Sequence, residues 1–494
     1  MGIAAVDGLQ KLSETDLRRF RERLDALGYR PELLAEAEAV APGQLDAVSL
    51  PLVRWELAQR GDAAGRLALL LSYADAVDAV RVETDLGADL VAGLTEAGLL
   101  VRSANDALTC PFRLVPVEGL LVLGDEPSAG PDAVMGPGPT TLELASQLPL
   151  ACSGPALDVG AGAGTLALLL AARGANPVVA TDINPRAATV GAFNARLNGL
   201  ALEFRTGDLD APVAGRRFAW VVSQPAYVLR PDDTAAVTFL HGGRRGDELA
   251  FRLLARIPAL LASEGTALLL FDTPVNAQTP LTKRVRASLD AAAVDVVVLA
   301  APALGPGAQA VGYAALEVPQ LGPGYAEALR RYRSHLAKLA FTEWTHALVV
   351  LRTDPRLPPR GRYTVQLPVR TLSQDGPDAL VKLLGALELA CLPDDALLAT
   401  AVGFQPRAKL MEERTRPGAE PVRRVTIERG AFGTERIVTD AGLALLDALE
   451  EARDVAEAVD RYAQLCDAEP NEVRNTVLDF VREGLGRGLL LPRG

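Results

Sequence analysis

Basic residues, cysteines and histidines are scarce in this sequence, and each shortage excludes a class of protein. The 494 residues include 50 Lys and Arg against 62 Asp and Glu. The net charge of −12 has the wrong sign for a protein that grips a nucleic acid backbone over a broad surface. The four cysteines show no CxxC spacing and only three histidines are present, so neither a disulfide framework nor a zinc site is encoded. We therefore expect a protein of the reducing cytoplasm, without a metal or a nucleic acid partner.

Long apolar runs are missing as well. The longest uncharged stretch, 296–316, contains Pro302 and Pro306 and three glycines, which would break a membrane-spanning helix. We interpret this stretch as a strand, a loop and a second strand. The first twenty residues lack a basic region followed by an apolar block, so we expect neither a secretion signal nor a membrane partner. Aromatic residues make up only 5 %, so the cores must be aliphatic, and the length indicates about three domains.

The first part of the chain has a helical pattern. From 15 to 80, apolar residues recur at three- and four-residue spacing. A further helix is expected over 87–100, followed by two short strands around 103–106, which is the order found in winged helices. Because 87–98 contains no Lys or Arg, this helix suits packing or covering a substrate better than reading DNA. Residues 1–124 are thus predicted to be a mainly helical, winged-helix-like domain.

The central part alternates helices with short apolar strands. Residues 125–139 are rich in Gly, Pro and Asp and are predicted to be a linker. The alternation that follows is typical of a doubly wound α/β domain with a parallel sheet, predicted over 140–353. A closing strand is expected at 312–318 or at 345–352, and we favour the second, with a helix over 325–340 before it. The other expected strands are 156–160, 177–182, 202–208, 218–224, 266–272 and 294–300.

The last part of the chain begins with a proline-rich stretch at 354–363. Residues 354–430 are predicted to be a linker and a small α+β region. Three helices are expected near 442–449, 455–467 and 471–484. Their spacing resembles that of small winged-helix or peptide-docking domains, which we predict for 431–494.

The first expected strand of the central domain runs into a turn rich in glycine. That strand ends at Asp158, and the next two end at Asp182 and Asp208. Asp182 follows the turn by about the separation at which an acid reaches the ribose hydroxyls of a nucleotide. Asp208 is placed to accept a hydrogen bond from an adenine amine. Only glycine lets the backbone turn this tightly beside a ligand, and the turn contains Gly160, Gly162 and Gly164.

These glycines and acids resemble the cofactor site of class I S-adenosylmethionine-dependent methyltransferases, over about 140–352. The resemblance implies that S-adenosylmethionine is the cofactor and that the glycine turn follows its methionine part. It places Asp158 near the amino group and Asp182, with Ile183 beside it, at the ribose. Asp208 and Leu209 would frame the adenine. Thr140 lies in a segment, GPGPTTLEL, that resembles a cofactor-contact loop or a plain helix cap.

Two other readings of the glycine turn remain open. A dinucleotide dehydrogenase has the pattern GxGxxG, whereas this chain has GxGxG, so the expected third glycine is missing. A turn that serves only packing would also contain glycines.

The fourth strand ends in the sequence SQPAY. It resembles the (Asn/Asp)-Pro-Pro-(Tyr/Phe) signature of methyltransferases that act on planar nitrogens, including the glutamine side chain of release factors or the amino group of adenine. Gln224 takes the amide position, Pro225 and Tyr227 match, and Ala226 replaces the second proline. The Gln224 side-chain carbonyl and the Pro225 main-chain carbonyl are candidates to accept hydrogen bonds from the substrate nitrogen. Tyr227 offers a ring face to the substrate or the sulfonium. Alternatively, the SQPAY segment is a turn that ends the strand and has no role in catalysis.

The segment after this signature contains two further candidates. His241 could accept a proton from the substrate, although a lone histidine is more often structural. Asp247 is expected to cap the following helix.

The residues together predict direct transfer of a methyl group to a nitrogen or oxygen atom of a peptide, a protein side chain or a peptide-derived natural product. A methyltransferase of small specialised metabolites and a catalytically idle methyltransferase fold that serves as scaffold or sensor are the alternatives. Assembly as a homodimer stays open. A transcription regulator would need basic recognition helices, which neither end of the chain provides.

Overall fold

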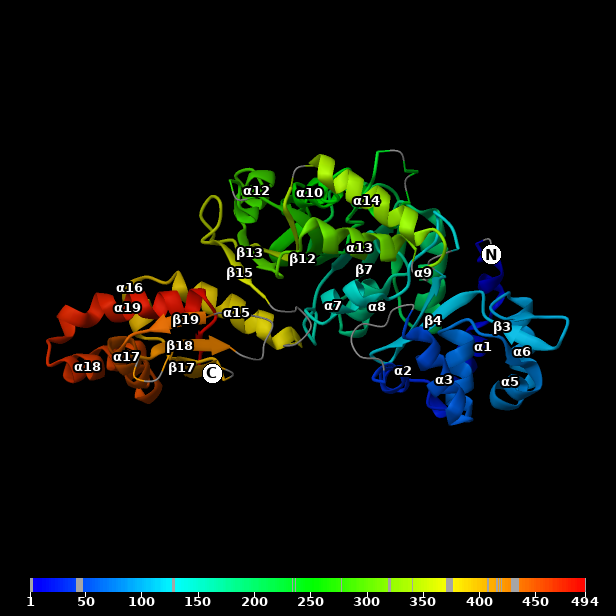
Figure 1. Ribbon diagram of the computed structural model, residues 1–494, viewed down its shortest axis with the longest axis horizontal. Helices are drawn as coiled ribbons and strands as arrows, with labels where there is room; N and C mark the ends of the chain where they lie inside the picture. Colours follow the sequence, from blue (N-terminus) through cyan, green and yellow to red (C-terminus); the bar gives the residue numbers. More distant parts are fainter. Residues whose placement is uncertain are drawn as a thin grey trace.

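The protein has three parts arranged along one axis, with the sheet domain in the middle (Figure 1). The computed structural model describes residues 3–493 except 41–47, 127–128, 233, 236, 277, 319–320, 340, 370–375, 407, 415, 417, 419 and 428–434, and it leaves the side chains of 376–378, 427 and 435 undescribed. The N-terminal part is drawn in blue at one end and the C-terminal part in orange and red at the other.

The N-terminal part consists mainly of short helices, as the apolar spacing predicts. A helix followed by a hairpin is also present as α6, β2 and β3, in a small sheet with the strand order β1-β3-β2. The kinship of this part with winged helices stays a prediction. The elements are η1 (Asp7–Lys11), α1 (Glu14–Ala26), α2 (Pro31–Glu38), α3 (Leu50–Arg60), α4 (Ala63–Leu71), β1 (Val77–Asp78), α5 (Ala79–Leu86), α6 (Ala88–Glu96), β2 (Val101–Arg102) and β3 (Ala107–Thr109).

A second hairpin, β4 (Phe112–Val117) with β5 (Leu120–Asp125), joins the N-terminal part to the sheet domain. Two asparagines on the α9 side (α9 is Pro185–Leu197) hold its free edge. The Asn194 amide exchanges two hydrogen bonds of 2.8 Å with the backbone of Leu123, and the Asn198 amide does the same with Leu121 at 2.9 and 2.7 Å. The amides stand in for a neighbouring strand, because backbone groups buried there would otherwise lack partners.

The central sheet has eight strands in the order β15-β13-β14-β12-β9-β6-β7-β8. It is mixed, which corrects the expectation of a parallel sheet: β14 runs antiparallel to both neighbours, β12 and β13. The closing strand is the favoured one, near 345–352. The strands are β6 (Ala156–Val159), β7 (Val178–Asp182), β8 (Glu203–Thr206), β9 (Phe218–Ser223), β12 (Leu261–Val275), β13 (Asp295–Ala300), β14 (Glu343–Arg352) and β15 (Thr364–Pro368).

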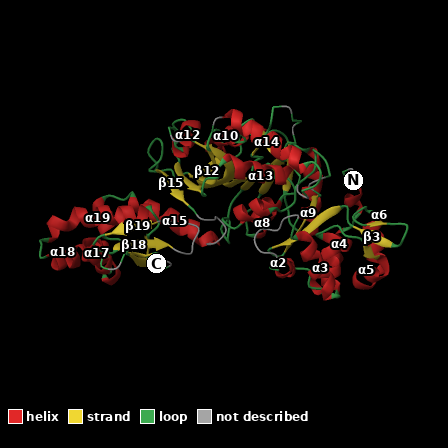
Figure 2. Cartoon of the chain, in the orientation of Figure 1, coloured by secondary structure: helices red, strands yellow, loops and turns green. Residues whose placement is uncertain are grey.

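Helices cover both faces of this sheet (Figure 2). One face packs on α7 (Pro139–Ala145), α8 (Thr165–Ala172) and α9, and its apolar cluster continues into the N-terminal part. The other face packs on α10 (Glu248–Leu254), α11 (Ile257–Leu260), α12 (Leu281–Ser288), α13 (Pro306–Glu317) and α14 (Tyr325–Leu339). Two apolar cores, one on each side of the sheet, therefore fix the strand ends, and aromatic side chains such as Trp344 and Phe193 are buried in them.

The second strand expected in 296–316 is wrong, because α13 occupies its place. Pro306 starts the helix at its first turn, where a missing N–H costs nothing, and the alanines that follow have the highest helix propensity. Ala310, Tyr313 and Ala314 bury one face of the helix. An uncharged helix packed against a sheet has the same composition as a buried strand, which is why composition alone misled.

The C-terminal part follows directly from the sheet. β15 pairs with β13, so the sheet continues past residue 353, where we expected the domain to end. The three predicted helices are present as α17, α18 and α19. The elements are α15 (Gly376–Ala390), α16 (Asp394–Leu398), β16 (Val402–Phe404), β17 (Ala408–Glu413), β18 (Val422–Ile427), β19 (Glu435–Val438), α17 (Asp440–Glu451), α18 (Val455–Cys466), α19 (Pro470–Gly486) and β20 (Leu490–Pro492).

Within the described residues, no helix is both long and apolar enough to span a bilayer. Nor does the described part of the chain bring together three or more His, Cys, Asp or Glu side chains in a way that could hold a metal ion.

Candidate active site

A cleft of about 430 Å³ opens at the carboxyl ends of the central strands. Ligand sites of open α/β sheets lie at this edge, and the volume is typical of small-molecule pockets. The cleft brings together Thr140, Asp158, Gly160, Gly162, Asp182, Ile183, Asp208, Leu209, Gln224, Pro225, Tyr227 and His241, which are all of the predicted site residues but one. Because they come from six separate segments, their meeting is a property of the fold.

The exception is Gly164, which does not line the cleft. It precedes α8 with a φ of +83°, and a Cβ there would lie 2.8 Å from the Phe204 ring. This glycine therefore serves helix packing, and its expected contact with the cofactor has no support in the geometry. Gly160, with a φ of +72°, differs: a Cβ there would meet no protein atom within 4 Å, so the backbone is bare toward open space.

Asp182, at the end of β7, is tied to the glycine turn. Its two carboxylate oxygens accept hydrogen bonds from the backbone N–H groups of Gly162 and Asn184, each at 2.8 Å. Burial raises the pKa of Asp182, and these backbone donors oppose that rise. The next residue, Ile183, leaves 57 % of its surface exposed in the cleft wall. The Asp182 carboxylate can accept hydrogen bonds from sugar hydroxyls, and the exposed Ile183 side chain beside it can pack against a flat ring attached to that sugar.

Asp158, at the end of β6, lies beneath the start of α8. One oxygen accepts a hydrogen bond of 3.0 Å from the backbone N–H of Ala167. Burial, with a smaller contribution from the negative charge of Asp182, raises the pKa of Asp158 to about 7. A cation placed beside it would favour its ionised form, so the site is suited to a positively charged amino group.

Asp208 lines the cleft but already has a cationic partner. Its carboxylate accepts a hydrogen bond of 2.7 Å from Arg252 on α10, and its side chain is about half exposed. Leu209 next to it adopts a left-handed φ of +50°, and its carbonyl accepts a hydrogen bond of 2.8 Å from Thr181. Asp208 and Leu209 thus line the cleft together with Arg252, which the sequence did not indicate, and their role at an adenine ring stays a prediction.

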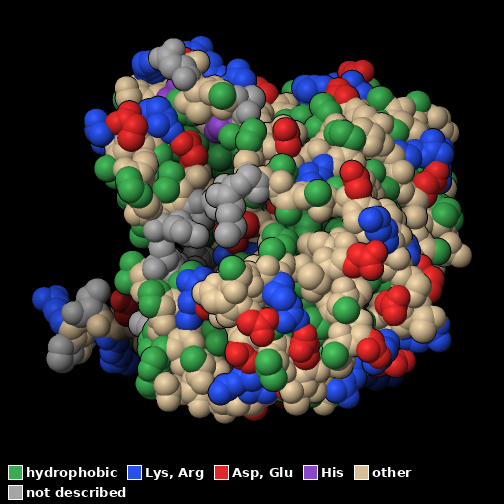
Figure 3. Space-filling model, turned by 90° about the vertical axis from the view of Figure 1, so that its right-hand side faces the viewer, with side chains coloured by type: hydrophobic (Ala, Val, Ile, Leu, Met, Phe, Trp, Pro, Cys, Tyr) green, Lys and Arg blue, Asp and Glu red, His purple; other side chains and the backbone are tan. Residues whose placement is uncertain are grey.

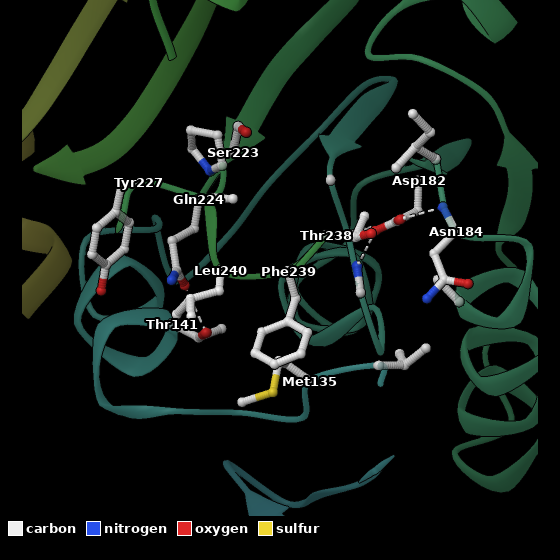
Figure 4. Close-up of a pocket in the computed structure, with 18 of the residues that line it drawn as sticks. Met135, Thr141, Asp182, Asn184, Ser223, Gln224, Tyr227, Thr238, Phe239 and Leu240 are labelled. Atoms are coloured by element: carbon white, nitrogen blue, oxygen red, sulfur yellow. Dashed lines mark hydrogen bonds between the residues drawn. The ribbon is translucent and has the colours of Figure 1, made fainter. Parts of the chain in front are cut away.

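The loop after β9 is held from below by α7. The Gln224 amide donates to the Thr140 hydroxyl at 2.9 Å, and its carbonyl accepts from the Thr141 hydroxyl at 2.7 Å (Figure 4). The predicted acceptor for the substrate is thus fixed by two threonines, with one lone pair of its carbonyl still open. Thr140, predicted to touch the cofactor, lines the cleft and also grips Gln224. Tyr227 is buried, which raises its pKa.

His241 is a poor proton acceptor in this structure. Its Nδ1 accepts a hydrogen bond of 3.0 Å from the backbone N–H of Val237, and Nε2 lies 3.4 Å from the Tyr332 hydroxyl. Burial lowers the pKa of His241 to about 4, so the ring is neutral near pH 7. Its basic nitrogen is occupied by the backbone, and the predicted catalytic role is left without geometric support.

The expected helix cap at Asp247 is wrong. Asp247 precedes α10 but makes no side-chain capping bond. Instead its fully buried carboxylate accepts hydrogen bonds from Thr273, at 2.8 Å, and from Arg284. A buried charge requires a charged partner, and this requirement outweighs the smaller gain from a cap.

Several residues of the site were not anticipated from the sequence. Met135 and Phe239 both project into the cleft, and Met135 comes from the stretch that we predicted to be a linker (Figure 4). His346 on β14 packs edge-on against Tyr227, with ring centroids 5.9 Å apart. No local pattern marks Met135 or Phe239, which reach the cleft from segments outside the named strands, and His346 lies behind Tyr227 rather than on the cleft wall.

The residues of the cleft fit S-adenosylmethionine. Asp182 would hold the ribose, Ile183 the adenine face and Asp158 the amino group, while the bare backbone at Gly160 leaves room for the chain between them.

Comparison with known proteins agrees with this geometry. Residues 138–287 match the family model "Methyltransferase small domain". A Deinococcus radiodurans protein named release factor glutamine methyltransferase is 39 % identical over 132 residues, which cover 25 % of this chain and 47 % of that protein. A Methanocaldococcus jannaschii protein provisionally named a protein N5-glutamine methyltransferase is 30 % identical over 118 residues, 23 % of this chain and 59 % of that protein.

A third relative acts on a different substrate class by its name. The ribosomal RNA small subunit methyltransferase B of Thermus thermophilus is 38 % identical over 107 residues, 22 % of this chain and 24 % of that protein. The chain thus spans about half the length of the first two relatives and a quarter of the third. All three matches lie in methyltransferases. The central domain is therefore a methyltransferase domain, and its cofactor is S-adenosylmethionine, as the sequence predicted.

Proposed function

We propose that this chain transfers a methyl group from S-adenosylmethionine to a nitrogen or oxygen atom of a peptide or protein side chain. The observation that carries the proposal is the meeting of the Asp158, Asp182 and Asp208 carboxylates with the Gln224–Tyr227 loop in one cleft. Two relatives with glutamine methyltransferase names support a side-chain substrate. The flanking parts, which we propose to be winged-helix-like, would select that substrate.

The residues of the chain would bind, orient and desolvate the reactants. The cofactor supplies an electrophilic methyl group on a sulfonium. Asp182 would accept hydrogen bonds from the ribose, and Tyr227 would present its ring beside the reacting atoms. The Pro225 carbonyl and the open lone pair of the Gln224 carbonyl would orient the substrate N–H groups, because a delocalised amide nitrogen reacts only when it is aligned. His241 would line the cleft as a neutral ring.

RNA and small molecules are the competing substrates. The third relative is named for ribosomal RNA, whereas the net charge of this chain is −12. On the face drawn in Figure 3, basic and acidic side chains are interspersed and form no single basic field. Such a surface would hold a phosphate backbone weakly. We therefore propose the peptide substrate ahead of the other two.

The test has two stages. Calorimetry with purified protein should first show binding of S-adenosylmethionine. The protein and methyl-labelled cofactor are then incubated with peptides that carry a central glutamine, asparagine or acidic residue. Parallel incubations contain total ribosomal RNA or a metabolite extract instead of the peptides. Label in peptides supports the proposal, and label only in RNA or metabolites refutes the peptide substrate. Binding without transfer to any of the three would indicate an idle scaffold.

A further inference from the structure

A charged network that the reaction scheme does not use lies behind the Gln224–Tyr227 loop. His346 on β14 is directly opposite Asp272 on β12, and its Nδ1 lies 2.5 Å from a carboxylate oxygen of Asp272. Its Nε2 lies 3.3 Å from a carboxylate oxygen of Glu143 on α7. The three side chains are only 13–22 % exposed. One imidazole thus bridges two strands of the sheet to the short helix α7.

The network holds a positive charge at its centre. Burial works against a charged His346, but the hydrogen bonds and charges of Asp272 and Glu143 outweigh it and raise the pKa of His346 to about 10. Among the described residues, Tyr227 also faces the network, as do Tyr313 and Gln309 from α13, and the Gln309 amide donates to Asp272 at 2.9 Å. With both ring nitrogens protonated, His346 cannot accept a proton from a substrate.

Both ends of the network lead to the site. Glu143 lies one helical turn after Thr140, on the same short helix that grips the Gln224 amide through Thr140 and Thr141. The His346 ring meets the Tyr227 ring edge-on, with the two planes inclined by 66°. A substitution of His346 would therefore alter the contacts of both α7 and Tyr227.

We propose that His346, ion-paired between Asp272 and Glu143, is a positioning residue that fixes α7 and Tyr227 and thereby holds the Gln224 amide in place for methyl transfer. The expected effect on methyl transfer rests on the proposed function, whereas the positioning of α7 and Tyr227 rests on the observed contacts of His346. His346 touches neither the cofactor nor the substrate in this assignment. A displacement of orienting groups by about 1 Å lowers the rate of transfer by up to about 100-fold.

Hydrogen–deuterium exchange of the full chain tests the cause without any substrate. His346→Gln removes the charge, and exchange should rise about tenfold in peptides that cover 139–145 and 223–228, and stay unchanged in α8. His335→Gln is the matched control, because His335 is a buried histidine on α14 that bonds to the carbonyl of Arg244. It should leave both peptides as in the wild type. Unchanged exchange of 139–145 and 223–228 in His346→Gln would overturn the proposal.

Two further variants guard against a folding defect. Glu143→Gln leaves the pair of His346 with Asp272 intact and should loosen 139–145 alone, whereas His346→Lys keeps a cation between the carboxylates and should restore at least part of the protection. Equal exchange in His346→Lys and His346→Gln would refute the role of the charge.

Activity separates this inference from the proposed function. With a peptide that the wild type methylates, His346→Gln should lower kcat and leave the Kd of S-adenosylmethionine within about twofold. A wild type that transfers no methyl group would refute the proposed function and leave the exchange result standing. A wild type and a His346→Gln variant with equal kcat would refute the positioning role alone.

Discussion

Replacing Asp182 by Asn gives the most direct measure of cofactor binding, because it removes one charge and changes little of the shape. Asp182 offers two carboxylate oxygens, each engaged by a backbone N–H at 2.8 Å and facing the cleft. An asparagine has a single oxygen, so it can serve only one of Gly162 and Asn184 and offers no charge to the ribose. Each charge-assisted hydrogen bond contributes roughly 1.5–3 kcal/mol, which corresponds to an increase in Kd of about 10- to 150-fold.

The assay is calorimetric titration of the purified variant with S-adenosylmethionine, with thermal unfolding measured in parallel to show that the fold is intact. Asp210→Asn is the control: Asp210 follows the neighbouring strand, pairs with Arg256 at 2.6 Å and does not line the cleft. Its Kd should match that of the wild type. If Asp182→Asn bound the cofactor as tightly as the wild type does, Asp182 would not hold the ribose and the assignment of the cleft would be wrong.

Four other predictions follow from the same contacts. Burial raises the pKa of Asp158 from 3.8 to about 7, so the contribution of this group to stability is largest below pH 3.8 and is lost between pH 3.8 and 7. Asp158→Asn should therefore raise the Tm of the cofactor-free protein at pH 8, through a gain in unfolding free energy on the order of 4 kcal/mol at most. An unchanged Tm at pH 8 would contradict the burial argument. The pKa of His346 is raised from 6.5 to about 10, so its stabilisation of the fold is complete below pH 6.5 and is lost as the pH rises to 10. Thermal unfolding should show this loss of unfolding free energy, on the order of 5 kcal/mol at most, and His346→Gln should lack it. Gln224→Ala should lower kcat and leave the calorimetric Kd of the cofactor within about twofold, and an equal loss of both would place Gln224 in the cofactor site. Asn194→Ala would orphan the buried backbone groups of Leu123 and should lower the free energy of unfolding by about 2–4 kcal/mol in a urea titration, whereas a loss below about 0.5 kcal/mol would mean that the hairpin is not held by these amides.

The predicted residues that line the cleft could be named in advance, because each belongs to a local pattern. Asp158 and Asp182 lie at the ends of the apolar strands β6 and β7, and Asp208 follows the end of β8 by two residues; the strand ends of a doubly wound sheet face the ligand edge. The local sequence does not fix the roles of Gly164 and Asp247, because a glycine or an aspartate at a helix start serves packing, charge burial or ligand contact with the same local sequence.

The sequence by itself determined the alternation of strands and helices, the glycine turn and the acids at the strand ends, because backbone conformation and apolar periodicity are encoded within a few residues of each position. Only the tertiary structure decided the antiparallel placement of β14, the asparagine-held hairpin, the pairing of Asp208 with Arg252 and the bridge from Glu143 through His346 to Asp272. These features join segments up to about 200 residues apart. Their energies depend on which charges share one buried space, and that is fixed by packing rather than by any local pattern.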